Sequence, residues 1–212
     1  MARGISVFSR LSMRDVTLLK TLVETGSPTL VADLLRVPKS SVLSRAHLLE
    51  SYYGRLFDRL SGRGRWQPVP KMWVVAAEAN DALKSLERAS RIVKTLSGAS
   101  IPARYAQMRV YYLDFTCAMQ GNTMSYMIRQ YEMSQEHFRQ CASATERFLG
   151  GPIFNRPRSP RTPWVLNETG RVISSLLYNA RDSFKQSETA LSGNTPVIAS
   201  GSTESDSGYQ TT

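Results

Sequence analysis

The chain has 212 residues, 42% of them hydrophobic, with 27 Lys and Arg against 17 Asp and Glu and a formal net charge of +10 at pH 7. That length suits one medium domain or two small ones, and no window approaches the roughly 18 uninterrupted apolar residues that a bilayer span requires. The first residues also lack an apolar run before a small-residue cleavage site, so we expect a cytoplasmic protein with neither a membrane partner nor a signal peptide.

Charge is distributed unevenly along the chain. Residues 1–98 hold 16 Lys and Arg against 8 Asp and Glu, residues 99–191 hold 11 against 7, and residues 192–212 hold none against 2. A basic body is typical of proteins that bind polyanions, because each neutralised phosphate releases condensed counterions, although a solvated surface can carry the same excess. The Ser-, Thr- and Gly-rich tail from Ser192 has almost nothing apolar to bury, so its composition predicts disorder.

Three short helices and a hairpin are predicted near the N-terminus. The first apolar helical pattern starts after Arg14 and ends at Gly26, and Ser27 is placed to cap a second helix. A third helix is expected over SVLSRAHLLESYYG, with Ser40 or Ser41 as its cap. The basic SGRGRW segment that follows contains two glycines and suits a tight two-stranded turn. Three helices followed by a basic hairpin predict a winged helix-turn-helix domain.

The same apolar pattern recurs 96 residues later, with residues 14–54 matching 110–150 without a gap. Identity is near background, so the prediction of two repeated units depends on coinciding apolar positions and turn landmarks. The expected fold is therefore mainly α, with two tandem winged helix-turn-helix domains, each followed by a long linker helix. The expected divisions are an N-terminal arm (1–11), the first winged domain (12–70), its linker helix (71–97), a connection (98–107), the second winged domain (108–166), its linker helix (167–191) and a disordered tail (192–212).

A specific set of residues closes each unit. In the second unit these are Glu146, Leu149, Gly150, Ile153, Phe154 and Arg156, which read E-x-x-L-G-x-x-I-F-x-R. In the first unit they are Leu49, Glu50, Gly54, Leu56, Phe57 and Arg59, with one residue missing after the glycine. This pattern resembles the end of the recognition helix and the start of the wing in LysR-type transcriptional regulators. The TGS sequence at residues 25–27 and LNETG at residues 166–170 are further similarities to that family.

The resemblance implies DNA binding by paired units, because in that family a long helix after the wing pairs antiparallel with its twin from another subunit. The α/β effector-binding domain that normally follows has no room in this chain, so we expect no inducer pocket. The starts of both recognition helices depart from the family's usual S-Q-P-A-V-S, so an operator sequence is not implied.

Two long helices are predicted after the hairpins, each with an apolar seam at alternating spacings of three and four. The first seam consists of Met72, Val75, Ala79, Ala82, Leu86, Ala89, Val93 and Leu96, and the second of Ile173, Leu176, Ala180, Phe184 or Ser183, Ser187 and Ala190. Either each seam packs on the first helix of its own domain, or the two seams pair antiparallel within one chain. The ten-residue connection LSGASIPARY spans at most roughly 33 Å, which permits such pairing. The chain would then be a monomeric pseudo-dimer whose half-sites need not be palindromic, and a homodimer is the alternative.

Candidate DNA contacts follow from the expected helix starts and wings, because residues near the start of a recognition helix read bases and the wings hold phosphates. In the first unit the candidates are Ser27, Thr29, Lys39, Ser40, Ser44, His47, Arg63 and Arg65. In the second unit they are Thr123, Ser125, Gln135, Glu136, Arg139, Gln140, Ser143, Arg158 and Arg161. Any one of them is alternatively a solvated side chain, and Arg59 and Arg156 alternatively pair with Glu50 and Glu146 to brace the fold. Packing roles around wing and linker are expected for Trp66, Trp73 and Trp164.

Together these patterns predict a sequence-specific, bacterial-type transcriptional regulator that binds double-stranded DNA in the nucleoid, with RNA polymerase or another regulator as a further partner. Two alternatives stay open: an architectural factor of a mobile element, acting in excision or partition, and a protein-binding antiactivator. We expect no enzyme, because the sequence contains no P-loop, GxSxG, HExxH or dinucleotide fingerprint. Cys117 and Cys141 form no CxxC or His/Cys cluster, so we expect buried thiols, no disulfide, no metal and no cofactor.

Overall fold

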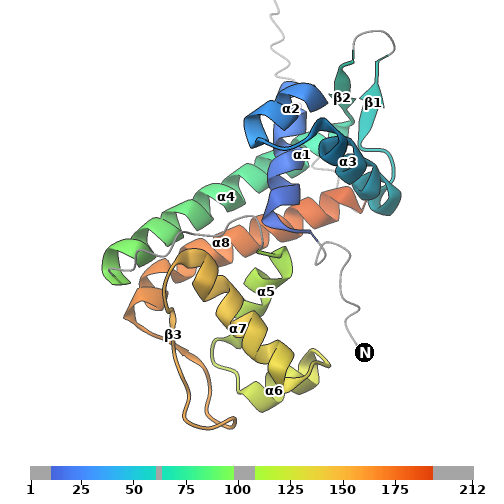
Figure 1. Ribbon diagram of the computed structural model, residues 1–212. Helices are drawn as coiled ribbons and strands as arrows, with labels where there is room; N and C mark the ends of the chain where they lie inside the picture. Colours follow the sequence, from blue (N-terminus) through green and yellow to red (C-terminus); the bar gives the residue numbers. More distant parts are fainter. Residues whose placement is uncertain (1–10, 61–63, 98–107, 193–212) are drawn as a thin grey trace, which may run out of the picture.

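A computed structural model describes residues 11–60, 64–97 and 108–192, and these residues form a mainly helical protein (Figure 1). The first half contains α1 (Met13–Thr25), α2 (Pro28–Leu35), α3 (Lys39–Tyr53), β1 (Phe57–Arg59), β2 (Trp66–Pro68) and α4 (Pro70–Ser97). The second half repeats this order with α5 (Val110–Met119), α6 (Met124–Gln130), α7 (Gln135–Leu149), β3 (Phe154–Asn155), β4 (Val165–Leu166) and α8 (Glu168–Leu191). The expected arm up to residue 10, the connection 98–107 and the tail from residue 193 lie outside the described residues.

Local capping explains the boundaries of the first helices. Ser12 and Asp15 form a capping box at the start of α1, and Gly26 ends that helix in the left-handed conformation at φ 60°. Ser27 caps α2 as predicted, because its hydroxyl accepts the Leu30 N–H. The expected cap of α3 at Ser40 or Ser41 is wrong. That helix begins earlier, at Lys39, and the Pro38 carbonyl accepts its first backbone bonds instead of a serine side chain.

Each half contains a two-stranded antiparallel hairpin between its third helix and its long helix. Phe57 pairs with Pro68 in the first hairpin, and Phe154 pairs with Leu166 in the second. The first turn of α8 requires a glycine where it packs on the residues before the second hairpin, because a Cβ at Gly170 would lie 2.1 Å from the Ile153 carbonyl oxygen.

The two long helices, α4 and α8, run antiparallel and make the most extensive contact between elements (Figure 1). Lys71 at the start of α4 donates a hydrogen bond to the carbonyl of Leu191 at the end of α8, with 3.3 Å between nitrogen and oxygen. The buried face of α4 includes Met72, Val75, Ala79, Ala82, Leu86, Ala89 and Val93. The buried face of α8 includes Ile173, Leu177, Ala180, Phe184, Ser187 and Leu191. The structure therefore shows the second of the two packing arrangements that the seams allow.

Two predicted seam positions are wrong. Leu96 is 55% exposed, because a straight α-helix drifts by roughly 20° per heptad and carries the last position off the buried face. Leu176 is only half-buried, and its neighbour Leu177 occupies the buried line, one helical step of four after Ile173. The remaining seam predictions, with Phe184 rather than Ser183, fall on buried positions.

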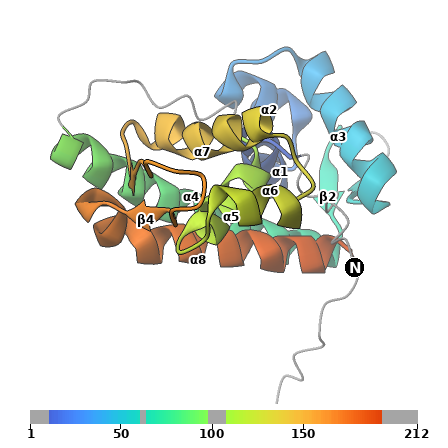
Figure 2. The same cartoon turned by 90° about the horizontal axis from the view of Figure 1, so that it is seen from below.

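The starts of the two halves also meet. Met13 donates its N–H to the Met108 carbonyl over 2.8 Å, and Val110 donates its N–H to the Leu11 carbonyl over 3.1 Å. Each donor is the first residue of its helix, and the two bonds flank an antiparallel bridge between Ser12 and Arg109. Both three-helix groups lie on one side of the α4–α8 pair (Figure 2).

The buried apolar residues of both halves form one contiguous core. In the part of the chain that the structure describes, no helix is long and apolar enough to span a membrane.

Candidate nucleic-acid interface

The exposed surface at the start of α3 contains three of the eight contacts predicted for the first unit. Lys39, Ser40 and Ser44 are exposed, in the first two turns of a helix whose opposite face buries Val42 and Ala46. No side-chain hydrogen bond caps the start of α3 among the described residues. Lys39 gives the surface a positive charge.

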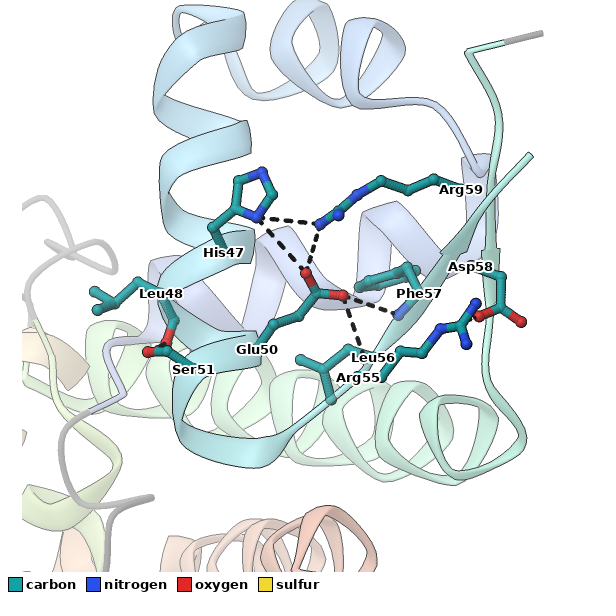
Figure 3. Close-up of polar contacts among 9 residues, drawn as sticks. All are labelled: His47, Leu48, Glu50, Ser51, Arg55, Leu56, Phe57, Asp58 and Arg59. Carbon is teal, nitrogen blue, oxygen red and sulfur yellow. Dashed lines mark hydrogen bonds and ion pairs between the residues drawn. The ribbon is translucent and has the colours of Figure 1, made fainter. Parts of the chain in front are cut away.

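His47 is exposed, but its imidazole contacts three other side chains. Its Nδ1 lies 3.1 Å from the Arg59 guanidinium and 3.8 Å from the Glu50 carboxylate (Figure 3). Its ring also meets the Trp66 ring edge to face. The imidazole therefore belongs to a network that joins α3 to the first hairpin. The prediction of His47 as a simple groove-facing contact did not include this network.

Glu50 is the centre of that network. One carboxylate oxygen accepts the backbone N–H groups of Leu56 and Phe57, and the other accepts from Arg59 over 2.6 Å (Figure 3). The Arg59 guanidinium also lies 4.9 Å from the centre of the Trp66 ring. These contacts hold the hairpin against α3, so the bracing role of Arg59 is the one that the structure shows.

The second half repeats the network with equivalent residues. Glu146 accepts the N–H groups of Ile153 and Phe154 at 3.0 and 3.2 Å and pairs with Arg156, whose guanidinium lies 5.3 Å from the Trp164 ring centre. The repeated carboxylate is the more deeply buried, with its side chain 7% exposed against 15% for Glu50. The two hairpins therefore have the same attachment to the helix before them.

The exposed surface at the start of α7 differs in chemistry from that of α3. Gln135, Glu136, Arg139 and Gln140 are exposed as predicted, and Ser143 is half-buried. Glu136 lies 3.9 Å from the Arg139 guanidinium and accepts a 3.4 Å hydrogen bond from the Gln140 amide. The charged groups on this surface thus partly satisfy one another.

The predicted helix-start residues divide into caps and exposed groups. Ser27 and Thr123 are half-buried, and their hydroxyls accept the N–H groups of Leu30 and Tyr126. Thr29 and Ser125 are exposed, and the Ser125 hydroxyl donates over 3.4 Å to the carbonyl of Pro160 in the second hairpin loop. The two caps use only their hydroxyl oxygens as acceptors, so their O–H groups can still donate to an external phosphate, whereas the Ser125 O–H is already donated to Pro160.

Three of the four predicted wing arginines are described, and all three are exposed. Arg65 lies at the start of β2, and Arg158 and Arg161 lie in the loop between β3 and β4. Arg63 lies outside the described residues. Trp66 and Trp164 are buried beneath the hairpins as expected, whereas the packing role predicted for Trp73 is wrong, because this side chain is 57% exposed on α4.

The sequence patterns did not predict an ion pair that joins α1 to α3. Asp15 is buried, and its two carboxylate oxygens accept from the Arg45 guanidinium at 2.5 Å. The hydrogen bond to Asp15 raises the pKa of Arg45 above its ordinary value, so the arginine stays charged. The one available signal was the position of Arg45 directly before the buried Ala46.

Other chemistry has little support in the described ranges. No group of three or more His, Cys, Asp or Glu side chains could hold a metal ion there. A groove of about 380 Å³ beside the first hairpin is lined by Glu50, Arg55, Phe57 and Arg59, but its charged groups are already paired, with Arg55 held by Asp58 at 2.5 Å. Both cysteines are buried, and burial raises the pKa of Cys117 to about 12 and that of Cys141 to about 11.

Comparison of the chain with protein-family models, curated proteins and solved structures finds no match. The functional conclusion therefore depends on the repeated geometry: two equivalent helices, each with an exposed polar start, and two hairpins with exposed arginines.

Proposed function

We propose that the chain is a transcriptional regulator that binds double-stranded DNA through two winged helix-turn-helix units, each similar to the DNA-binding domain of LysR-type regulators. The observation that carries this proposal is the repeated attachment of hairpin to helix. Helices α3 and α7 have 15 residues each, and each is followed by a hairpin fixed by the same Glu, Arg and Trp. In this proposal α3 and α7 are the recognition helices and the hairpins are the wings.

The surface chemistry supports this role. Side chains that donate hydrogen bonds to bases or phosphates are exposed at both helix starts, and Arg65, Arg158 and Arg161 are exposed on the hairpins. The net charge of +10 favours association with a polyanion.

Pairing of α4 with α8 supports the pseudo-dimer. Both three-helix groups lie on the same side of the long-helix pair (Figure 2). A homodimer of single-headed subunits presents two reading helices in this way. Here one chain supplies both, so we propose that its target consists of two different half-sites.

The test is a selection of DNA sequences by the purified chain, repeated with an Arg65→Ala variant and an Arg158→Ala/Arg161→Ala variant. We expect a motif with two dissimilar half-sites, each weakened by the variant of its own wing. Lys84→Ala is the matched control, because Lys84 is an exposed lysine on α4, away from the hairpins. A wild-type chain that selects no motif and binds no duplex at low salt would contradict the proposal.

One observation favours a second candidate for the second half. The partly self-paired Glu136, Arg139 and Gln140 make the start of α7 less suited to phosphates than the start of α3. In this candidate the first half reads DNA and the second contacts a protein, such as RNA polymerase or another regulator. A palindromic motif that is sensitive only to Arg65→Ala would favour it over the two-headed reader.

A further inference from the structure

Helix α4 holds the C-terminal ends of both α3 and α7. The Lys71 ammonium donates a hydrogen bond to the carbonyl of Tyr53, the last residue of α3, over 2.8 Å. The Ser90 hydroxyl, buried in the core, donates to the carbonyl of Leu149, the last residue of α7, over 3.2 Å. Tyr53 and Leu149 are equivalent residues, 96 positions apart. Helix α4 therefore donates a hydrogen bond to the equivalent carbonyl oxygen in each half.

The Lys71 contact joins three helices. Its ammonium also donates over 3.3 Å to the carbonyl of Leu191, the last residue of α8. The C-terminal end of a helix has a partial negative charge, so a cation is stabilised where two such ends converge. An ammonium has three donors, and two of them are used here for α3 and α8.

The end of α3 depends on this contact more than the end of α7 does. Helix α7 ends with Gly150 in the left-handed conformation, and the Gly150 and Gly151 N–H groups both bond the Glu146 carbonyl. The first half has one residue fewer after its glycine, and Gly54 adopts φ 72° and ψ −166° with no such bond among the described residues. The end of α3 therefore has the Lys71 bond to Tyr53 without the backbone cap that α7 has in addition to its Ser90 bond.

We propose that Lys71 is a positioning residue that fixes α3 relative to the α4–α8 pair, so that the two reading helices accept half-sites at one separation. This inference rests on the proposed DNA-binding function. Removal of the Lys71 ammonium frees the end of α3 while the Ser90 hydroxyl still holds α7. The target of a Lys71 variant is therefore the same pair of half-sites, accepted over a wider range of separations.

The first experiment measures affinity of the full chain for the selected half-sites at a series of spacer lengths. We expect the wild type to prefer one spacer, and Lys71→Met to lose roughly tenfold there while losing much less at neighbouring spacers. Lys71→Arg, which keeps a charged donor, restores part of the preference. Lys84→Met removes the same charge from an exposed position of α4 and leaves the profile unchanged. If Lys71→Met does not fold, Lys71→Gln takes its place.

A uniform loss of affinity that leaves the spacer profile of Lys71→Met unchanged would overturn the inference, because that result is what general destabilisation produces. The profile is the readout that a merely structural role does not alter.

A second experiment needs no DNA and separates the two proposals. Spin labels at Ser51→Cys on α3 and Arg147→Cys on α7, both exposed and 96 residues apart, report the distance between the helices. Cys117 and Cys141 are buried, so the native thiols are protected from the label. We expect a narrow distance distribution with Lys71 or with Lys84→Met, and a broad one with Lys71→Met. Equal widths would overturn the positioning role even if the chain binds DNA, and a chain that binds no DNA leaves this result intact.

Discussion

The two halves of the molecule have the same frame but different interiors. In the first half, Leu19 and Val42 pack at the centre of the three-helix group. The equivalent positions in the second half are Phe115 and Phe138, whose ring centroids lie 5.4 Å apart and whose cluster extends to Trp164. An aliphatic core and an aromatic core thus support α3 and α7, which have 15 residues each.

Some polar contacts beneath the helices occur in both halves, and others occur in one half alone. The Glu–Arg–Trp attachment of each hairpin is shared, whereas the Asp15–Arg45 ion pair occurs only in the first half. At the positions equivalent to Asp15 and Arg45 the second half has Tyr111 and Cys141. The shared order of helices and strands therefore depends on the burial pattern and on the Glu–Arg–Trp attachment of each hairpin, while the remaining side chains vary.

Removal of the glutamate that attaches each hairpin should cause the largest loss in the free energy of unfolding, and the loss should differ between the two halves. Glu146→Ala leaves the buried N–H groups of Ile153 and Phe154 without an acceptor, so we expect a loss of about 3 kcal/mol in the free energy of unfolding. Glu50→Ala, at the more exposed site, is expected to cost about half as much, roughly 1.5 kcal/mol. Urea unfolding measures both, and equal losses would contradict the difference in burial.

The next effect tests the ion pair that only the first half possesses. Asp15→Ala removes the partner of Arg45 and the acceptor of the Ser12 N–H, and we expect it to cost about 2 kcal/mol. Glu24→Ala breaks the exposed Lys20–Glu24 pair on the same helix and serves as the control, with an expected change of less than about 0.5 kcal/mol. For Asp15→Ala, amide hydrogen exchange should become faster in α1 and α3. An equal rise in the exchange rate of α5 and α7 would argue against an effect limited to the first half.

A smaller effect concerns the charge available to DNA in each half. The logarithm of affinity falls as the logarithm of salt concentration rises. Each phosphate that a variant no longer neutralises makes this slope shallower by about 0.9. We expect Lys39→Ala/Arg65→Ala to lower the slope by about 2, and Arg158→Ala/Arg161→Ala to lower it by less, because Glu136 at the start of α7 repels phosphates. Fluorescence anisotropy over a salt series gives these slopes. A larger change for the second pair would reverse the proposed ranking of the two halves.

The smallest effect is restricted to the second half, because both cysteines lie there. Burial raises the pKa of Cys117 to about 12 and of Cys141 to about 11, so the folded protein holds these protons more tightly than the unfolded chain does. Their contribution to stability is complete below about pH 9 and falls as the pH rises from there toward 11. We expect no reaction with a thiol reagent at pH 8 until urea unfolds the chain. Rapid labelling of the native protein would disprove the burial.

The sequence predicted most of the elements because their burial pattern and caps are local. Gly26, Ser27 and the α4 seam residues from Met72 to Val93 have the roles expected of them, and α3 and α7 fall where the repeat placed them. Local patterns did not predict contacts between distant residues, such as Asp15 with Arg45 or Lys71 with Leu191. Leu96 and Leu176 were misplaced because a spacing of three or four residues defines a face only to within about one position per turn.

The antiparallel contact between α4 and α8 lies within one polypeptide, and this has a consequence for how the protein would act in a cell. A homodimer at low concentration forms in proportion to the square of the subunit concentration, whereas the two halves described above are already joined at any concentration. Occupancy of a target would therefore rise in simple proportion to the number of chains, without a threshold. A defective copy would also find the surface of α4 in an intact copy already filled by that copy's own α8.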